Sequence, residues 1–503
     1  MTHETTAVMA LLVPLGGCLL IGAAGRWPNV RELITLATAG ALFCLVASLY
    51  QPVVNGADIH AQLIQVLPGT AGVPRGISLE FHIEPLGLIY ALLASFLWIL
   101  NSLYSIGYMR TNQEANQTVY YMCFALALFS VIGIAFSGNL FTMFTFYELL
   151  SLCTFPLVTH KRTPEAVKAG RVYLGVLIGS SVGLQLAAII WTYAMVGHGE
   201  FMPGGILAGV VGATPAVLGL LYVLYVYGIA KCALMPLHKW LPAAMVAPTP
   251  VSALLHAVAV VKAGVFCVLK VTVYTFGLNT LTLGGHSDWL VWMACFTIVV
   301  GSLIAMYQDN LKRRLAYSTI SQLSYIVLAA GLATPIAIQG GALHMVMHGF
   351  GKITLFFCAG AIYTAAHKTE ISTMKGIGRK MPWTMLAFTL GSLSIIGLPP
   401  FGGAWSKWLL FVGALDAGQQ VVLVVLAVSS LLNIAYLMPI IINAWFLPKS
   451  EDSAGIDKVH EAPLLIVVPL MLTAIGGFVL FVWPDPLVKL AGMIAGAVGG
   501  PAS

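Results

Sequence analysis

The chain has little charge. Only 8% of its 503 residues are Asp, Glu, Lys or Arg, whereas 59% are hydrophobic. Soluble proteins carry about 25% charged residues. A larger core does not explain the shortfall, because a water-facing surface still needs charged groups for solvation. Most of the surface is therefore expected to face lipid, which predicts an integral membrane protein.

Cysteine pairs and nucleotide-binding motifs are also missing. The 8 cysteines stand singly in apolar stretches with no CxxC pair, so iron–sulfur, zinc-ribbon and dithiol sites lack ligands. No P-loop or GxGxxG stands in a strand-to-helix context, and no polar segment is large enough to bind a nucleotide. We expect no cofactor, no metal, no nucleic-acid partner, and no redox catalysis or ATP hydrolysis by this chain alone.

Long apolar runs are what the chain does have. A hydrocarbon core of about 30 Å needs about 20 apolar residues per helix, and about fourteen such runs occur. They centre near residues 17, 40, 97, 127, 149, 184, 225, 260, 298, 326, 352, 395, 430 and 472. No Lys or Arg precedes the first run, which predicts a retained helix and not a signal peptide. The polar connection from Gln51 to Glu84 is expected to be an extramembrane loop with some strand or hairpin.

Basic residues alternate between the loops, as the positive-inside rule requires. One set of loops holds Arg26, Arg31, Arg110, Lys161, Arg162, Lys168, Arg171, Lys239, Lys312, Arg313, Arg314, Lys368, Lys375, Arg379, Lys380, Lys449 and Lys458. The other set, with the termini, holds Arg75 and Lys489. A miscounted helix would scramble this alternation. We therefore expect both termini on the non-cytoplasmic side.

Five lysines lie inside apolar runs: Lys231, Lys262, Lys270, Lys352 and Lys407. A lysine at a helix centre costs roughly 2.5–3.5 kcal/mol on insertion scales. Its retention implies a structural partner or a role. Only a few apolar residues follow Lys270, so we expect this side chain to snorkel toward the interface.

Two of these lysines stand beside helix breakers. Lys231 precedes Pro236, and Lys407 follows Pro399, Pro400 and two glycines in LPPFGGAWSK. Proline removes a backbone hydrogen bond, and broken membrane helices line hydrated cavities. The two broken helices lie five helices apart, and odd spacing reverses the direction of travel, which indicates inverted repeats.

Glu148 is the only acidic residue deep in an apolar run. Unpaired, it would stay protonated, so an ion pair with Lys231 is the simplest explanation. At about 4 Å and an effective dielectric of about 20, such a pair attracts by roughly 4 kcal/mol before desolvation. A static structural ion pair is the alternative to a functional one.

A column of polar residues follows in HMVMHGFGK. His344, His348 and Lys352 are spaced i, i+4 and i+8 and share one helical face. With water between its members, such a column can carry protons, since histidine titrates near neutral pH. Structural packing is the alternative; a zinc site lacks a third ligand. His256, on the helix of Lys262, is a second relay candidate, and a structural histidine bonded to a backbone carbonyl is the alternative. The hydroxyls of AYSTISQLSY either continue the column or hold helices together.

The motifs resemble one known family. LMPLHKWLPAAMVAPTPVSALLHAVAVVKAG at residues 234–264, QDNLKRRLAYSTISQLSY and HMVMHGFGKITLFF are similar to motifs of the antiporter-like proton-channel subunits of respiratory complex I, Mrp-type Na⁺/H⁺ antiporters and membrane-bound hydrogenases. The resemblance covers about residues 80–445. It implies an all-α membrane fold of about fourteen transmembrane helices, with two inverted five-helix repeats and two broken helices. We place an N-terminal part at 1–117, the repeats at 118–275 and 288–447, and a final helix and tail at 448–503.

The resemblance also implies roles. Glu148 matches the family's fifth-helix glutamate, and Lys231 its partner on the broken seventh helix. Lys262 matches the central lysine. His344, His348 and Lys352 match the eleventh-helix relay, and Lys407 the exit residue, where some members have glutamate. Ala243 departs from the family, which often has aspartate there, and this leaves the uptake route open.

The resulting expectation is a proton-translocating subunit of a multisubunit complex in a prokaryotic inner membrane. Its partners would be lipid, other membrane subunits, and H⁺, with Na⁺ or K⁺ as further candidate ions. Four alternatives stay open: a subunit of a Mrp-type antiporter, a subunit of an NADH:quinone oxidoreductase or membrane hydrogenase without its own redox centre, a membrane partner in inorganic-carbon uptake, and a standalone cation/proton antiporter.

Overall fold

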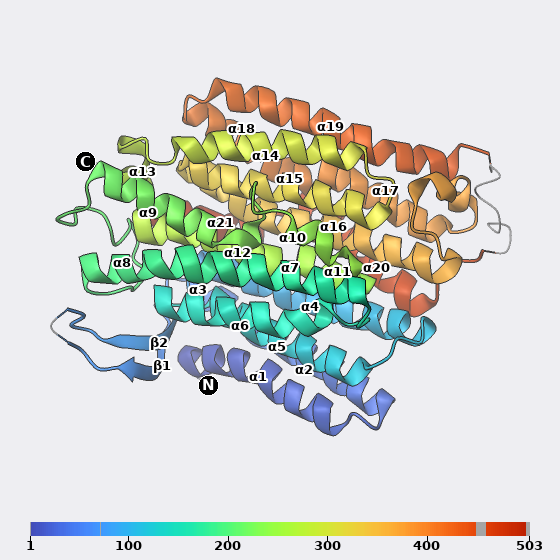
Figure 1. The fold of residues 1–503 in the computed structure, drawn as a ribbon, viewed down its shortest axis with the longest axis horizontal. Helices are drawn as coiled ribbons and strands as arrows, with labels where there is room; N and C mark the ends of the chain where they lie inside the picture. Colours follow the sequence, from blue (N-terminus) through green and yellow to red (C-terminus); the bar gives the residue numbers. More distant parts are fainter. Residues whose placement is uncertain (1, 71, 449–458, 499–503) are drawn as a thin grey trace.

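The structure, a computed structural model, describes residues 2–70, 72–448 and 459–498 and is a bundle of roughly parallel helices (Figure 1). Within these residues, 12 helices are long and apolar enough to cross a membrane. Two further spans are each split into shorter pieces. The prediction of an all-α membrane protein with about fourteen spans, two of them broken at the expected prolines, is confirmed. Lys449 and Lys458 lie outside the described residues.

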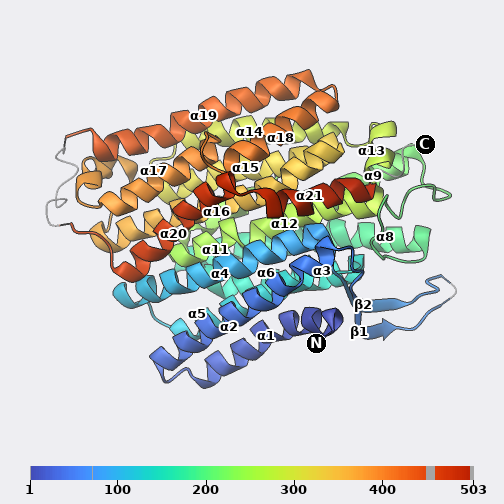
Figure 2. The ribbon, with the colours of Figure 1, turned by 180° about the vertical axis from the view of Figure 1, so that it is seen from behind.

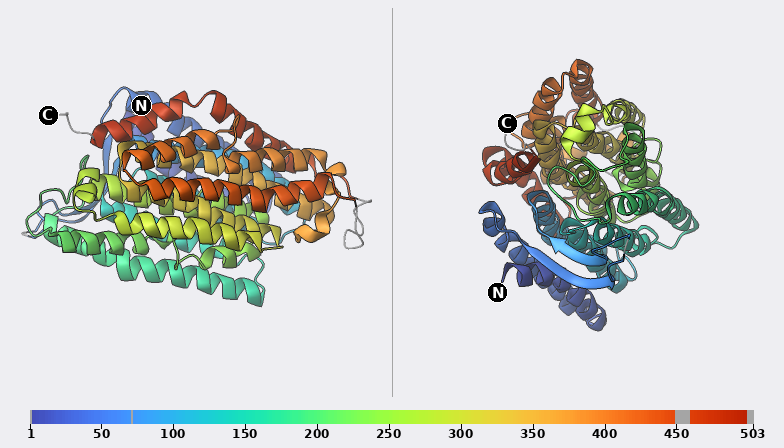
Figure 3. Two further views of the ribbon diagram at one scale, coloured as in Figure 1. Left: turned by 90° about the horizontal axis from the view of Figure 1, so that it is seen from above. Right: turned by 90° about the vertical axis from the view of Figure 1, so that its left-hand side faces the viewer.

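The N-terminal part supplies three spans and a hairpin. Its elements are α1 (His3–Ala23), α2 (Pro28–Ser48), α3 (Tyr50–Val54), β1 (His60–Leu67), β2 (Ile77–His82) and α4 (Pro85–Thr111). The antiparallel pair β1–β2 confirms the hairpin expected between Gln51 and Glu84. It packs against α1 and α6 and projects from one end of the bundle, at the left in Figure 1, and the right-hand view of Figure 3 faces this end. We call this the hairpin end.

Five spans follow, and the fourth of them is broken. The helices are α5 (Gln117–Ala135), α6 (Leu140–Val158), α7 (Pro164–Ser180) with α8 (Leu186–Val196), α9 (Pro215–Gly228) with the short α10 (Trp240–Ala243), and α11 (Thr249–Ala257) with α12 (Val260–Lys270). A single-turn 3₁₀ helix, Ala230–Cys232, follows α9 and carries Lys231. Residues around Gly205–Val211 form a loop.

The next five spans again have a break in the fourth. After α13 (Leu278–Leu283) come α14 (Asp288–Met306), α15 (Leu311–Leu332), α16 (Pro335–Ala366), α17 (Pro382–Ile396) with α18 (Gly403–Asp416), and α19 (Gln420–Trp445). The helices α20 (Leu464–Val482) and α21 (Asp485–Val498) then pack across α4 and α16, as seen from behind in Figure 2.

The second spans of the two groups share a local design. Asn139 caps α6 by accepting from the Thr142 N–H, and Asn310 caps α15 by accepting from the Arg313 N–H. Each asparagine also forms an isolated antiparallel bridge, with Glu200 and Glu370 respectively. The division into repeats at 118–275 and 288–447 stays a prediction, and these matching caps support it.

One interruption was not expected. Between α11 and α12 the residues Val258 and Ala259 leave the helical conformation, although neither is Pro or Gly. The Ala259 carbonyl accepts from the Ala263 N–H of α12 at 2.8 Å and also from the Tyr90 hydroxyl of α4 at 2.9 Å. The Tyr90 hydroxyl therefore ties α4 to the backbone at this interruption.

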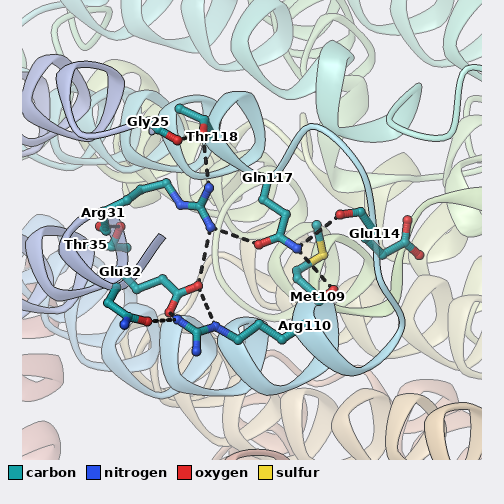
Figure 4. A network of polar contacts seen from close by, with 10 residues as sticks. Gly25, Arg31, Glu32, Thr35, Met109, Arg110, Glu114, Gln117 and Thr118 are labelled. Atoms are coloured by element: carbon teal, nitrogen blue, oxygen red, sulfur yellow. Dashed lines mark hydrogen bonds and ion pairs between the residues drawn. The ribbon is translucent and has the colours of Figure 1, made fainter. Parts of the chain in front are cut away.

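Side-chain ion pairs tie the N-terminal helices together at the end opposite the hairpin (Figure 4). Arg31 donates to Thr118 at 3.1 Å and to Gln117 at 2.9 Å, while Glu32 accepts from Arg31 and from Arg110. The network links α2, α4 and α5, so two of the loop arginines also have a structural role.

The core lies where α11, α12 and α16 meet. The most apolar windows of Thr249–Phe276 and of Pro335–Ala366 are wholly buried inside the bundle. These helices carry Lys262, His344, His348 and Lys352, so the ionisable side chains sit away from the lipid.

Candidate functional site

Lys231 is fully buried beside α6. Its ammonium donates to the Ser151 hydroxyl at 2.6 Å and to the Tyr147 carbonyl at 2.9 Å, and it lies 3.1 Å from the centroid of the Tyr147 ring. The break after α9 makes this contact possible, because it turns the chain into a 3₁₀ turn at Lys231. Close approach also needs Gly264, since a Cβ there would stand 2.3 Å from the Lys231 carbonyl carbon.

The expected ion pair between Lys231 and Glu148 is not formed among the described residues: no such contact lies within 4.0 Å. The physical reason is that Glu148 is the residue after Tyr147 on α6 and is turned about 100° around the helix from it. Its side chain is half-buried, and its buried Oε1 has no hydrogen-bond partner among the described residues. In this position the Lys231 ammonium is bonded to Tyr147 and Ser151, which lie near Glu148 on α6, and not to Glu148 itself.

Lys262 makes a polar contact between the two groups of spans. Its ammonium lies 2.6 Å from Nδ1 of His348 on α16, and both residues are buried. Lys262 follows the interruption at 258–259, and His256 precedes it. His256 packs against the Phe356 ring at 4.6 Å, and neither of its ring nitrogens has a partner among the described residues.

The histidine column extends from this contact toward α18. The rings of His344 and His348 stack with centroids 5.8 Å apart, which places them on one face as the spacing predicts. Nδ1 of His344 lies 2.9 Å from the Ser406 hydroxyl. Ser406 is the neighbour of Lys407, so the column connects the core to the second broken helix.

Lys352 turns toward α15 and not along the histidine column. Its ammonium donates to the Ser318 hydroxyl at 2.6 Å and to the Leu315 carbonyl at 3.3 Å. The Ser318 hydroxyl lies 2.6 Å from that of Tyr436, which donates to Asn433 at 2.6 Å. A polar chain thus runs from α16 through α15 to α19.

The sequence left two interpretations open for the hydroxyl groups of α15, a proton path or contacts that hold helices together. The structure contains an example of each. Ser318 joins the polar chain of Lys352. Ser321 bonds to Ser302 and to the Ile298 carbonyl and so holds α14 against α15. Thr319 and Ser324 bond to carbonyls four residues back in their own helix.

Lys407 lies on the first turns of α18, immediately beyond the break. Its ammonium donates at 2.8 Å to the Ile396 carbonyl at the C-terminal end of α17, where the helix dipole is negative. It is half-buried and lines an apolar cavity of about 630 Å³ with Trp405 and Trp408. Lys231, Lys262 and Lys352 are fully buried, whereas Lys407 reaches the surface of the bundle.

Lys270 corrects one expectation. It does not snorkel: it is fully buried and pairs with Glu84 at 2.6 Å, and it donates to the Ser137 carbonyl at 2.6 Å. The reason is that the chain after β2 folds back over the bundle and puts Glu84, the residue before α4, against α12. Sequence reasoning placed Glu84 at the end of a loop. The signal available in the sequence was that Glu84 directly precedes Pro85, the first residue of a membrane span.

Ala243 lies near a cavity at the end of the bundle opposite the hairpin. Its volume is about 440 Å³, and Glu165, Lys168 and Arg313 are among the residues that line it. Glu165 supplies a carboxylate to this cavity, so the absence of aspartate at 243 does not leave the cavity without an acid.

The sequence family described as "NADH:quinone oxidoreductase/Mrp antiporter, TM" matches residues 137–433. All eight candidate residues from Glu148 to Lys407 fall inside that range. The chain is 33% identical to NADH-quinone oxidoreductase subunit N of Desulforudis audaxviator over 83% of this chain and 85% of that protein. It is 31% identical to NADH-quinone oxidoreductase subunit L of Mycobacterium tuberculosis over 94% of this chain and 74% of that protein.

Solved structures share the fold. A chain of the Mrp complex from Dietzia sp. superposes with a TM-score of 0.86 at 21% identity, covering 100% of this chain and 98% of that one. A chain of an archaeal membrane-bound sulfane sulfur reductase superposes with a TM-score of 0.83 at 24% identity, covering 98% and 99%. At these identities the likeness establishes the architecture alone.

Proposed function

Because the chain belongs to the NADH:quinone oxidoreductase/Mrp antiporter transmembrane family, we propose that it translocates protons as an antiporter-like membrane subunit of a larger energy-converting complex. The observation that carries the proposal is the 2.6 Å contact between Lys262 and His348. It joins the two groups of five spans through two titratable side chains that are buried in the core.

The proposed route begins at Glu148 and Lys231, crosses by Lys262, His348 and His344, and leaves by Ser406 and Lys407. Lys352 and its Ser318–Tyr436–Asn433 chain form a branch beside it. Polar atoms without a protein partner occur along the way, at Glu148 Oε1 and at both ring nitrogens of His256. Buried polar groups of this kind are satisfied by water, so we infer that water links the side chains.

Lys231 is the proposed switch. In the observed position its charge is held by neutral acceptors, a hydroxyl and a carbonyl. Glu148 lies on α6, three residues before Ser151. The Lys231 ammonium can therefore exchange the Ser151 hydroxyl and the Tyr147 carbonyl for the Glu148 carboxylate. Moving one charge across 100 mV is worth about 2.3 kcal/mol, which is of the order of the roughly 4 kcal/mol attraction of such a pair at about 4 Å.

Proton flux tests this role. We predict that Lys231→Ala and Glu148→Ala abolish flux in proteoliposomes that contain the parent complex, while the subunit still assembles. The matched control is Glu4→Ala, which removes an exposed glutamate in the first turn of α1 and leaves flux intact. Full flux from the Glu148→Ala complex would refute the coupling role.

The partners proposed for the chain are other membrane subunits, because the similar proteins are named as oxidoreductase subunits or belong to solved complexes. Which complex it serves is settled by what co-purifies. Iron–sulfur or hydrogenase-like subunits indicate a redox complex, small antiporter subunits a Mrp-type Na⁺/H⁺ or K⁺/H⁺ exchanger, and a large soluble zinc protein inorganic-carbon uptake. Purification as a lone active protein indicates a standalone antiporter.

We further propose a prokaryotic inner membrane as the location, with both termini on the non-cytoplasmic side. The alternation of basic loops supports this orientation. In Figure 1, α1 begins in the half of the bundle that carries the hairpin, and α21 ends toward the same side. The hairpin end is then the non-cytoplasmic end.

A further inference from the structure

Three metal-binding side chains come together on the β-hairpin. Asp58 stands just before β1, His60 begins β1, and His82 ends β2. His60 and His82 are direct cross-strand partners, so their side chains project from the same face of the hairpin. The spacing in the sequence does not reveal this group, because the ligands come from both ends of a 25-residue stretch, Asp58 to His82, that only the hairpin brings together.

The geometry of the three groups suits a small divalent cation. Oδ1 of Asp58 lies 2.9 Å from Nε2 of His60 and 3.2 Å from Nε2 of His82, and the potential ligand atoms all lie within 4.8 Å of one another. A tetrahedral zinc site with metal–ligand bonds of about 2.0–2.1 Å places neighbouring ligand atoms about 3.3 Å apart. The two Asp58–histidine separations need little adjustment to reach this spacing, whereas the rings of His60 and His82, stacked with centroids 3.9 Å apart, would have to turn toward a shared cation.

The backbone holds the three residues in place. The Ile83 N–H donates to the Ile59 carbonyl at 3.0 Å, and the His82 N–H donates to the Phe136 carbonyl at 2.9 Å. Ile59 and Phe81 are buried beneath the hairpin. The site is therefore built on strands that are anchored to the corner between α5 and α6, and not on a free loop.

The site is open to the medium and its histidines are suited to ligation. The side chains of Asp58 and His60 are 74% and 57% exposed. The His82 side chain is 25% exposed, so its ring can be reached from the medium, and neutral imidazole is the form that binds metals. The contacts of both rings with one carboxylate oxygen are the alternative use of these groups, without a metal.

We propose that Asp58, His60 and His82 form a binding site for Zn²⁺ or a divalent cation of similar ligand preference. Imidazole and carboxylate together suit Zn²⁺ better than Mg²⁺ or Ca²⁺, which prefer oxygen ligands alone. Three protein ligands leave one coordination position for water or a further group. The proposal departs from the expectation, drawn from the sequence, that the chain holds no metal site.

The site adjoins a cavity that reaches the Lys270 region. The cavity has a volume of about 240 Å³, and Asp58, His82, Glu84 and Tyr274 are among its lining residues. A cation bound by the hairpin would thus stand at the wall of the cavity that also holds the partner of Lys270. The proposal does not depend on the proton-translocation role.

Zinc titration of the full-length chain in its purified complex tests the site. After removal of metals with a chelator, bound Zn²⁺ is counted by equilibrium dialysis with elemental analysis. The wild-type complex is expected to bind one more Zn²⁺ per chain than the His60→Gln or His82→Gln complex. Losing a direct ligand should weaken binding at this site by at least the roughly 10–100-fold that follows loss of a supporting group.

His286→Gln is the matched control, because it makes the same substitution in a histidine that lies outside the cluster. It is expected to keep the wild-type stoichiometry. Asp58→Asn, at a largely exposed position, serves as a third variant that leaves the packing unchanged, and Co²⁺ absorption reports the ligand set directly. Equal Zn²⁺ binding in the wild-type, His60→Gln and His82→Gln complexes would overturn the proposal.

Discussion

Two of the buried lysines, Lys231 and Lys352, are held by neutral oxygen acceptors and not by carboxylates. Lys231 donates to Ser151 and the Tyr147 carbonyl on α6, and Lys352 donates to Ser318 and the Leu315 carbonyl on α15. In both cases the serine Oγ lies at 2.6 Å and the carbonyl comes from about one turn earlier in the same helix. A neutral acceptor stabilises the ammonium without fixing it, so such a lysine can release its proton more readily than one locked to a carboxylate.

The branch at Lys352 can be tested by removing one hydroxyl. Tyr436→Phe deletes the group that links Ser318 to Asn433. We expect stability to change by only about 0.5–1.5 kcal/mol, the net value of a typical hydrogen bond. If the branch takes part in conduction, losing this hydroxyl raises the free-energy barrier to proton transfer. An increase of about 1.4 kcal/mol in that barrier slows proton flux about tenfold.

Tyr222→Phe is the control for that measurement, since this hydroxyl bonds to Thr272 away from the branch. Flux is measured with a pH-sensitive dye in proteoliposomes. An unchanged rate in the Tyr436→Phe complex would assign the Lys352 chain to packing alone.

The Glu84–Lys270 pair makes a prediction about stability. Glu84→Gln leaves the Lys270 ammonium buried without its counter-charge, which typically costs about 3–5 kcal/mol. We expect a marked fall in the thermal unfolding midpoint of the purified chain. The double replacement Glu84→Leu with Lys270→Leu is expected to recover most of the loss, because an apolar pair needs no counter-charge.

Glu80→Gln, on the same hairpin but outside this pair, is the control. Unfolding at the wild-type temperature in the Glu84→Gln variant would show that the pair contributes nothing to stability.

Residue-level prediction from the sequence succeeded where a charge stands in a long apolar run. Such placement is expensive, so Lys231, Lys262 and Lys352 could be recognised without a structure, and all three are buried as expected. It failed where tertiary folding decides the partner. The pairing of Lys270 with Glu84 depends on the return of the chain after β2, and the acceptors of Lys231 depend on the rotation of α6, neither of which composition encodes.

At the scale of elements, the helix breaks fall into two kinds. Those at Lys231 and Lys407 follow from prolines, which cannot complete a helical hydrogen-bond ladder, and the sequence predicted both. The interruption at Val258 and Ala259 has no breaker residue. Its contact with the Tyr90 hydroxyl comes from another helix, and no local residue type marks its position, so the sequence offered no means of locating it.

The packing of α12 on the first break gives an element-scale prediction. A Cβ on Gly264 would lie 2.2 Å from the Cys232 nitrogen and 2.3 Å from the Lys231 carbonyl carbon. Both contacts are with backbone, so Gly264→Ala must push α12 away from the 3₁₀ turn. We expect a strong loss of proton flux, because Lys231 leaves its position on α6 and Lys262 moves with its helix.

Gly179→Ala is the matched control, since a Cβ at this helical glycine meets nothing within 4 Å. Flux and the assembled fraction are measured for both variants. Wild-type flux in the Gly264→Ala complex would show that close packing at Lys231 is not required for transport.

At the scale of the whole molecule, the two groups of spans meet in one enclosed core. Lys262 comes from the first group and His348 from the second, and Ser406 continues from the histidine column into the second broken helix. The positively charged loops and the count of spans could be predicted because both follow from physical rules that act along the chain. The contact between the groups could be predicted only through the family resemblance, since nothing local pairs residues 86 positions apart.

The central claim is that this contact carries protons, and Lys262→Met tests it most directly. Methionine keeps the length and apolar stem of lysine but removes the titratable group beside His348. Proton uptake driven by a membrane potential is measured in proteoliposomes that hold the assembled complex, with the exposed Lys489→Met as control. We predict that Lys262→Met gives no flux above that of protein-free liposomes while Lys489→Met matches the wild type; wild-type flux from the assembled Lys262→Met complex would contradict the account.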